Sequence, residues 1–249
     1  MKGLVVPALL VLVAEIAAAA AGLQSDSLAR PSAIALALAG ALADGSIAAA
    51  TWATLAATLI GLAIGGASGL LAGALLGMSR TADRLMVVSV EIFRPIPSVA
   101  LIPIAMLVFG FGYRMEFSIV AFATFWPMLI FARTAVAGIE PRLLEVSRAL
   151  GFGLGARIAK IVLPAALPRV FLALRLSAGI TLVVAVTVEI SGNTQGLGHA
   201  LMDAQQSLRP DLMFALLIWV GLIGWGLNML MLLCQHRLFG PAALTGAQR

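Results

Sequence analysis

Charged residues are scarce in this sequence: 11% of its 249 residues are Asp, Glu, Lys or Arg, whereas 61% are hydrophobic. Soluble globular domains carry about 25% charged residues, and the mean hydropathy of +1.07 lies far on the apolar side. This scarcity excludes an ordinary soluble domain. It predicts a single all-α integral membrane domain over residues 1–249.

Cysteine, histidine and lysine are also rare. Cys234 is the only cysteine, so no intrachain disulfide can form. His199 and His236 fall on opposite sides of the predicted topology, so a paired-histidine metal site is excluded and we expect no metal. The only lysines, Lys2 and Lys160, do not belong to a GxxxxGK[ST] phosphate-binding loop. No nucleophile–histidine pair stands out either. We therefore expect no catalytic residues, no enzyme activity and no bound cofactor on this chain.

Six apolar segments approach the length of about 20 residues that a membrane-spanning helix needs. A shorter apolar stretch at 32–44 predicts a helix at one interface or against the bundle. The predicted spans are 4–22, 51–77, 85–110, 116–136, 169–190 and 212–233. The start of the chain also resembles a secretory signal, in which case cleavage would leave five spans. Because Glu15 interrupts the apolar run, we expect the first span to be retained.

The basic residues set the orientation. A net charge of +5 would suggest nucleic acid in a soluble protein, but here Lys and Arg are scattered between apolar runs, so no nucleic-acid partner is expected. With the N-terminus inside, most of them face the cytoplasm, as the positive-inside rule requires. The residues predicted inside are Lys2, Arg80, Arg84, Arg142, Arg148, Arg157, Lys160, Arg237 and Arg249; those outside are Arg30, Arg114 and Arg209. Both termini are therefore predicted to be cytoplasmic.

Glycines recur every four residues in the second predicted span, so they share one helix face. Helices in lipid associate through close backbone packing, which small residues allow. We interpret this face as an intrachain packing surface, with a homodimer seam as the alternative. The five glycines are Gly61, Gly65, Gly69, Gly73 and Gly77.

The third predicted span begins EIFRPIPSVALIP, and its prolines must kink or break the helix. Broken helices are tolerated in membranes where they line a wet cavity or lie buried in protein. Glu91 and Arg94 are three residues apart and can pair on one helix face. One interpretation is that Glu91, Arg94, Pro95 and Pro97 form a wall of a translocation path. The other is an arginine that reaches back to the interface.

Two further acidic residues interrupt apolar runs. Glu189 ends the fifth predicted span, and Glu15 lies within the first. Carboxylates inside a membrane are costly and by default indicate function. Because Glu189 lies near the outer interface, a structural or gating role is the alternative to a place in the translocation path.

Residues 145–168, EVSRALGFGLGARIAKIVLPAALP, form a polar and cationic island. Pro141 suits the first turn of a helix, and Gly151 suits a helix stop because glycine reaches left-handed dihedrals. We predict two short helices with a sharp bend, the second from about Leu154 to Val162, with Leu163-Pro164 breaking it. Glu145 precedes Gly151 by six residues, and Leu163 follows it by twelve.

This spacing resembles the "EAA" loop of permeases of bacterial ABC importers, although Val146 and Ser147 replace the two usual alanines. Other stretches are similar to the sulfonate, taurine and nitrate branch of that family: the glycine-rich 51–84, FRPIPSVALIPIAMLVFGFG and VEISGNTQGLGHALMDA. The resemblance covers 31–237, preceded by a first span and outer loop at 1–30 and followed by a cytoplasmic tail at 238–249.

The resemblance implies a type I importer bundle in the bacterial inner membrane with a cytoplasmic coupling helix. Two copies of the chain would form the path for a small anionic solute: a sulfonate, taurine, nitrate or a related organic acid. Two ATPase subunits, carrying ATP and magnesium, would bind the 141–164 loop, and a periplasmic substrate-binding protein would deliver the solute. The residues implied in coupling are Glu145, Ser147, Ala149, Gly151, Leu163 and Pro164.

Two other classes of function remain as alternatives. An ion-coupled secondary transporter needs no ATPase, but it should show internal repeats and charges near the membrane midplane, which we do not find. An intramembrane enzyme would need a catalytic constellation, which we do not find either. Association with an ATPase subunit discriminates among the three classes.

Overall fold

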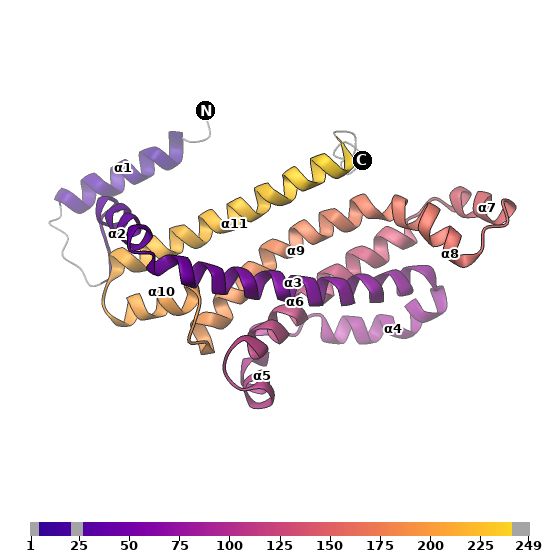
Figure 1. The fold of residues 1–249 in the computed structure, drawn as a ribbon, viewed down its shortest axis with the longest axis horizontal. Coiled ribbons are helices and arrows are strands. Elements are labelled where there is room, and N and C mark those ends of the chain that lie inside the picture. Colours follow the sequence, from indigo (N-terminus) through magenta and orange to yellow (C-terminus); the bar gives the residue numbers. More distant parts are fainter. Residues whose placement is uncertain (1–4, 21–26, 241–249) are drawn as a thin grey trace.

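The computed structural model describes residues 5–20 and 27–240, and every regular element within them is a helix. The long helices run side by side and give the molecule an elongated body (Figure 1). In chain order the elements are α1 (Val5–Ala20), α2 (Pro31–Ala43), α3 (Ser46–Met78), α4 (Arg80–Phe93), η2 (Ser98–Leu101), α5 (Ile102–Phe109), α6 (Tyr113–Ala137), α7 (Pro141–Ala149), α8 (Leu154–Arg157), η3 (Ile158–Val162), α9 (Leu163–Gly192), α10 (Leu197–Gln206) and α11 (Pro210–Phe239). The all-α membrane fold is thus confirmed.

Four helices in the described residues are long and apolar enough to cross a membrane: α3, α6, α11 and the continuous helix from Gly155 to Gly192. A bent pair formed by α4 and the Ser98–Phe109 segment supplies a fifth candidate. Within the segment 4–22, α1 has 16 described residues, and both flanks lie outside the described part. The count of six spans therefore stays a prediction.

The five-glycine face of α3 lies directly on α6. A methyl group added at Gly65, Gly69 or Gly73 would overlap a backbone carbonyl oxygen of α6, and one at Gly61 would overlap the Val120 side chain. At Gly77 the carbonyl oxygen of Arg133 would lie 2.8 Å away. The absence of side chains lets the two backbones approach this closely. Helix α9 completes the core, for example through the buried residues Ala57, Val120 and Ala185.

The proline-rich segment divides the third predicted span into two helices. Helix α4 and the Ser98–Phe109 segment meet at 80°. Pro95 and Pro97 lie in this corner, while Pro103 occupies the first turn of α5, where a missing N–H has no cost. The predicted break is confirmed, and the two helices together remain one candidate span.

The predicted short helix at 32–44 is present as α2, and it is tied to α1 through Glu15. The Ser32 amide donates to Glu15 Oε2 at 3.0 Å, and the Ser32 hydroxyl donates to Oε1 at 2.8 Å. Glu15 thus satisfies a free donor at the α2 N-terminus. After α2 the chain turns at Asp44, where hydrogen bonds from the Ser46 hydroxyl and amide lower the pKa of the Asp44 carboxyl.

The helix break predicted at Leu163-Pro164 is wrong. One continuous helix runs from Gly155 to Gly192. The turn before Leu163-Pro164 is a π-helix, η3, and its last bond runs from the Leu163 amide to the Ile158 carbonyl. A wider turn relieves the clash between a proline ring and the preceding carbonyls. Pro164 is therefore accommodated in the first turn of α9, and Pro168 lies inside the same helix.

Candidate functional site

Helices α7 and α8 form a bent pair at one end of the molecule, far from α10 and α2 (Figure 1). Gly151 joins them with a φ of 67°, the left-handed conformation predicted from the sequence. The Phe152 amide donates to the Ser147 carbonyl at 2.9 Å, which is the six-to-one bond that closes a Schellman motif. This motif ends α7 sharply and fixes the direction of α8.

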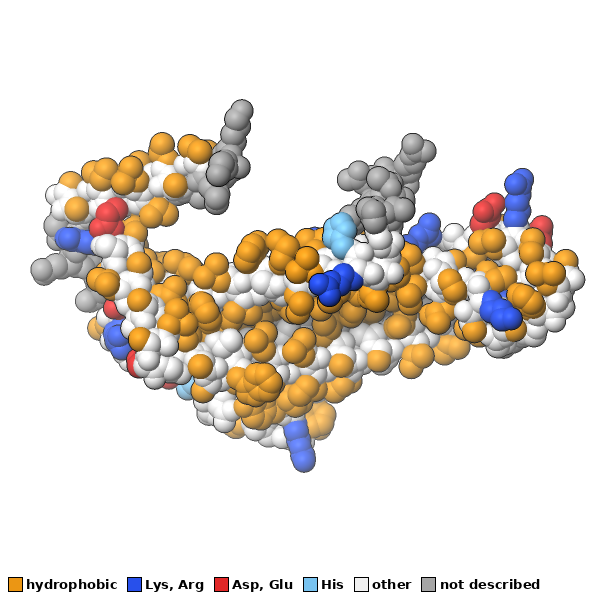
Figure 2. Space-filling view, turned by 45° about the horizontal axis from the view of Figure 1, so that its top comes forward, with side chains coloured by type: hydrophobic (Ala, Val, Ile, Leu, Met, Phe, Trp, Pro, Cys, Tyr) orange, Lys and Arg blue, Asp and Glu red, His pale blue; other side chains and the backbone are white. Residues whose placement is uncertain are grey.

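One face of α7 carries large apolar side chains that no described part of the chain covers. Leu143, Val146 and Leu150 are 42%, 53% and 62% exposed. Their spacing of three and four residues places them on one face of the helix, and Arg142 and Glu145 are exposed beside it. Figure 2 shows acidic and basic side chains gathered at this end, next to hydrophobic ones. Such a mixed, exposed stripe is typical of a protein-binding surface.

The six residues predicted to act in coupling do not share one surface. Glu145 and Ala149 are exposed on α7, and Leu163 and Pro164 are exposed at the start of α9. Ser147, by contrast, is fully buried, so it faces the interior. Lys160 reaches across the bend, with its Nζ 5.2 Å from the centre of the Phe152 ring.

A cavity of about 470 Å³ opens beside the bend between α4 and η2. Arg94 lines it, and no hydrogen bond or ion pair of its side chain is found within the described chain. The predicted pairing of Glu91 with Arg94 is absent, and Glu91 does not line the cavity. Pro95 and Pro97 are exposed at the bend after α4 and do not line the cavity either. The lining consists of Arg94, Ile96, Ser98, Phe122, Ala123, Trp126, Pro127, Ile130, Phe131, Ile180 and Val184.

Trp126 is the centre of the aromatic wall of this cavity. Its ring stacks with Phe93 at 6.4 Å and meets Phe122 edge-on at 5.7 Å. Its indole Nε1 is buried without a hydrogen-bond partner. A buried indole N–H usually has a partner, and within the described chain this one has none. Trp126 could not be predicted as a site residue from the sequence, because an aromatic residue in an apolar helix carries no signal of its own.

Glu189 is 1% exposed, and its carboxylate faces inward from α9 rather than into the Arg94 cavity. Its Oε2 accepts from the Gly198 amide at 2.8 Å and from the Thr54 hydroxyl at 3.0 Å. Glu116 of α6 is also 1% exposed; its Oε2 accepts from Asn193 Nδ2, and its carboxyl lies close enough to Glu189 to interact electrostatically. Sequence reasoning missed Glu116, because it stands at the predicted start of a span, where an acidic residue normally meets water.

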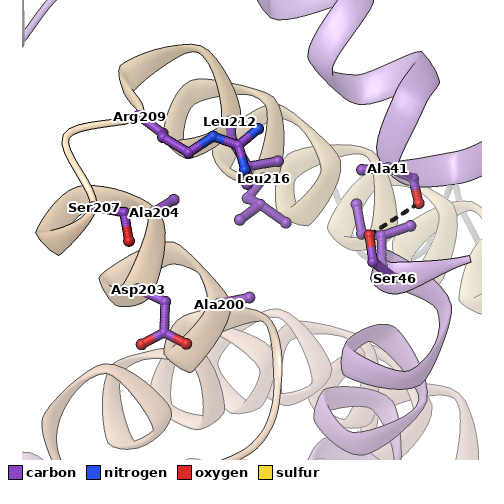
Figure 3. A pocket seen from close by; sticks show the side chains of 10 residues that line it. Ala41, Ser46, Ala200, Asp203, Ala204, Ser207, Arg209, Leu212 and Leu216 are labelled. Atoms are coloured by element: carbon purple, nitrogen blue, oxygen red, sulfur yellow. Dashed lines mark hydrogen bonds between the residues drawn. The ribbon is translucent and has the colours of Figure 1, made fainter. Parts of the chain in front are cut away.

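A second cavity of about 240 Å³ lies near the opposite end from α7, between α2, α3, α10 and α11. Figure 3 shows Asp203 and Arg209 at separate borders of it, with apolar side chains such as Leu212 and Leu216 between the helices. Because it presents both signs of charge, this cavity has no evident preference for an anion.

The fold and this arrangement define a multi-helix membrane permease. The family of inner-membrane components of binding-protein-dependent transport systems matches residues 65–239, and the chain belongs to that family. It is 33% identical over 150 residues to the aliphatic sulfonates transport permease SsuC of Bacillus subtilis and 28% identical over 163 residues to the taurine transport system permease TauC of Escherichia coli. These alignments cover 60% and 66% of this chain and 54% and 59% of the relatives. The chain therefore spans little more than half the length of these relatives.

Solved structures of ABC transporters share the fold. The inward-facing MetNI methionine transporter superposes with a TM-score of 0.62 at 23% identity, covering 74% of this chain and 94% of that chain. An amino acid ABC transporter gives a TM-score of 0.64 at 19% identity, covering 81% and 98%. At this level of identity the likeness establishes the fold of an ABC importer permease and nothing about the solute.

Proposed function

We propose that two copies of this chain form the transmembrane path of an ATP-driven importer in the bacterial inner membrane. Two ATPase subunits, carrying ATP and magnesium, bind the loop 141–164 on the cytoplasmic side, and a periplasmic binding protein delivers the solute. Both termini face the cytoplasm. Family membership and the type I importer fold support this proposal.

The observation that carries the proposal is the exposed apolar stripe of α7. Leu143, Val146 and Leu150 lie at the tip of the molecule, where the adjoining arginines predict cytoplasm rather than lipid. Exposed apolar side chains in water are stabilised by a partner that covers them. The Schellman turn at Gly151 holds α7 firmly to α8, and the helix continues from there into α9. A displacement of α7 by the ATPase is thus transmitted along one continuous helix to the core.

The solute is a small organic anion that binds beside Arg94. The unpaired guanidinium can donate hydrogen bonds to an anion, and charge-assisted bonds of this kind are the strong ones. The wall from Phe122 to Phe131 is apolar and suits the carbon body of a sulfonate or related acid better than a bare inorganic ion. Two copies would place two arginines near one cavity and create a field that attracts anions. The relatives named for aliphatic sulfonates and taurine agree with this class.

Co-purification with the ATPase tests the docking surface. The affinity-tagged chain is extracted from membranes that also contain its ATPase subunit, and the eluate is assayed for ATP hydrolysis and for a subunit with a Walker motif. Leu143→Glu and Val146→Glu place charges in the apolar stripe, so we expect the ATPase to be lost from the eluate.

Arg84→Gln, an exposed position outside the loop 141–164, is the control and should retain the ATPase. Thermal unfolding of each purified variant shows whether the bundle itself is intact. An ATPase that remains bound to both stripe variants would contradict the proposed docking surface.

A further inference from the structure

Two carboxyl groups from separate helices meet in the interior of this protein. Glu116 lies in the first turn of α6 and Glu189 near the end of α9; each is 1% exposed, and the two carboxyl groups lie close enough to interact electrostatically. Glu189 Oε2 accepts from Gly198 N and Thr54 Oγ1, and Glu116 Oε2 accepts from Asn193 Nδ2 at 2.6 Å. Each Oε1 is buried and has no donor among the described residues.

Carboxylate oxygens are acceptors only, so two ionised carboxylates in contact repel each other and leave both Oε1 atoms unsatisfied. No described cation faces the pair to offset two negative charges. The neighbouring elements present Thr54 on α3, the apolar cluster of Ile102 and Ala105 on α5, and backbone amides on α10. His199 and Asp203 of α10 pair with one another at 3.3 Å, with side chains that are 36% and 60% exposed.

One proton shared by the two carboxyl groups removes the conflict. Glu189 is the ionised partner in this arrangement, because it faces the N-terminus of α10, where amides and the helix dipole favour a negative charge. Glu116 is then the protonated partner: its O–H donates to the Glu189 carboxylate, while its Oε2 accepts from Asn193. The shared proton supplies a donor that the buried pair otherwise lacks.

The same pair holds α10 in place. The first two amides of α10 bond to the cluster: Leu197 N donates to Thr54 Oγ1 at 2.9 Å, and Gly198 N donates to Glu189 Oε2. Gly196 has a φ of 97°, and a methyl group there would overlap the Glu189 carboxyl. The loop before α10 is closed by Tyr113, whose hydroxyl donates to Gln195 Oε1. The loop backbone at Gly196 thus lies directly against the Glu189 carboxyl.

We propose that Glu116 and Glu189 form a proton-binding latch, in which one shared proton keeps α10 closed on α3, α6 and α9. When the proton leaves, repulsion between the two carboxylates opens the junction and exposes the buried face of α10. Binding and release of this proton thus control how α10 packs at the end of the bundle remote from α7. This inference does not depend on the ATPase partner or on the solute.

Infrared spectroscopy of the full chain in lipid nanodiscs tests the proton. We expect the C=O band of a protonated carboxylic acid at pH 7.5, and its loss in Glu116→Gln. The amide of that variant replaces the O–H donor and still accepts from Asn193, so the fold should be retained. Glu140→Gln, an exposed carboxyl, should leave the band unchanged. A wild-type protein without the band, or a band that persists in Glu116→Gln, would overturn the proposal.

Thiol labelling tests the latch. In a Cys234→Ser background, Ala204→Cys reports on a buried position of α10 that is 3% exposed, and Gln205→Cys reports on an exposed one. The ratio of the two labelling rates cancels the intrinsic pH dependence of thiols. Because the open state releases one proton, the ratio should rise by up to about ten-fold per pH unit. It should be independent of pH in Glu116→Gln. Equal pH dependence in both backgrounds would show that the pair does not control α10.

Discussion

Arg94 is the residue that most directly connects this fold to a solute. It is an exposed cation at the end of α4, and it has no partner in the described chain although Glu91 is only one helical turn away. Apart from Arg94 and Ser98, the residues that line the cavity beside it are apolar or aromatic. An arginine that only anchored the chain at the interface would not need to line such a cavity.

Replacing Arg94 should therefore impair transport without impairing assembly. A lost hydrogen bond to a charged group costs about 1.5–3 kcal/mol, so Arg94→Gln should lower ATP-driven uptake of an alkanesulfonate into reconstituted vesicles by about ten-fold or more. Basal ATP hydrolysis should persist. Arg84→Gln, an exposed arginine on the same helix, is the control. Uptake by Arg94→Gln at the wild-type rate would leave Arg94 with the anchoring role alone.

The two buried carboxyls show what sequence can reveal about single residues. Glu189 could be named as a candidate functional residue because a carboxylate inside an apolar run is energetically costly. Its partner Glu116 could not be predicted, because the contact depends on how α6 and α9 are placed against each other. The same holds for Ser147: the sequence placed it in the coupling loop, but only the fold shows that it is buried.

At the scale of the helices, the glycine face offers a matched pair of substitutions. A methyl group at Gly69 would overlap the Phe125 carbonyl, whereas one at Gly66 would have only Leu174 Cδ1 near it, at 3.9 Å. Overpacking typically costs 1–3 kcal/mol, so Gly69→Ala should lower the thermal unfolding midpoint. Gly66→Ala should be neutral or raise it, since alanine favours helix by about 1 kcal/mol over glycine. Equal midpoints would show that the α3–α6 approach is looser than described.

The bend of the coupling loop depends on one glycine. Gly151 has a φ of 67°, and a left-handed conformation costs other residues roughly 1–2 kcal/mol, most for β-branched ones. Gly151→Val should therefore distort the loop, weaken ATPase association and reduce uptake, with the unfolding midpoint of the spans unchanged. Gly153→Val is the control, because that glycine has neither a positive φ nor a neighbour within 4 Å of an added methyl group. Normal association in Gly151→Val would show that the bend is not required for docking.

The helices themselves were largely predictable, because apolar length, glycine spacing and the proline at position 141 are local signals. The continuity of the Gly155–Gly192 helix was not predictable from the sequence. A Leu-Pro pair normally ends a helix, and the π-helical turn that accommodates Pro164 leaves no trace in composition or spacing. The angle between α4 and the Ser98–Phe109 segment could not be predicted either, since prolines indicate a bend but not its size.

For the whole molecule, orientation can be tested by labelling. In a Cys234→Ser background, Tyr113→Cys and Gln205→Cys should react with an impermeant thiol reagent from outside intact cells. Thr81→Cys and Val146→Cys should react only after the membrane is permeabilised. The reason is the excess of Lys and Arg on the α7 side. The reverse pattern would invert the topology and remove the coupling role of α7.

The most direct test of an ATP-driven importer is uptake by the assembled complex in vesicles. The account predicts that an alkanesulfonate or taurine accumulates when ATP, magnesium and the cognate binding protein are present, and that dissipating proton and sodium gradients has no effect. The Leu143→Glu and Val146→Glu variants should abolish this accumulation while the bundle remains folded. Accumulation driven by an ion gradient without ATP, and unaffected by those substitutions, would contradict the account and identify a secondary transporter instead.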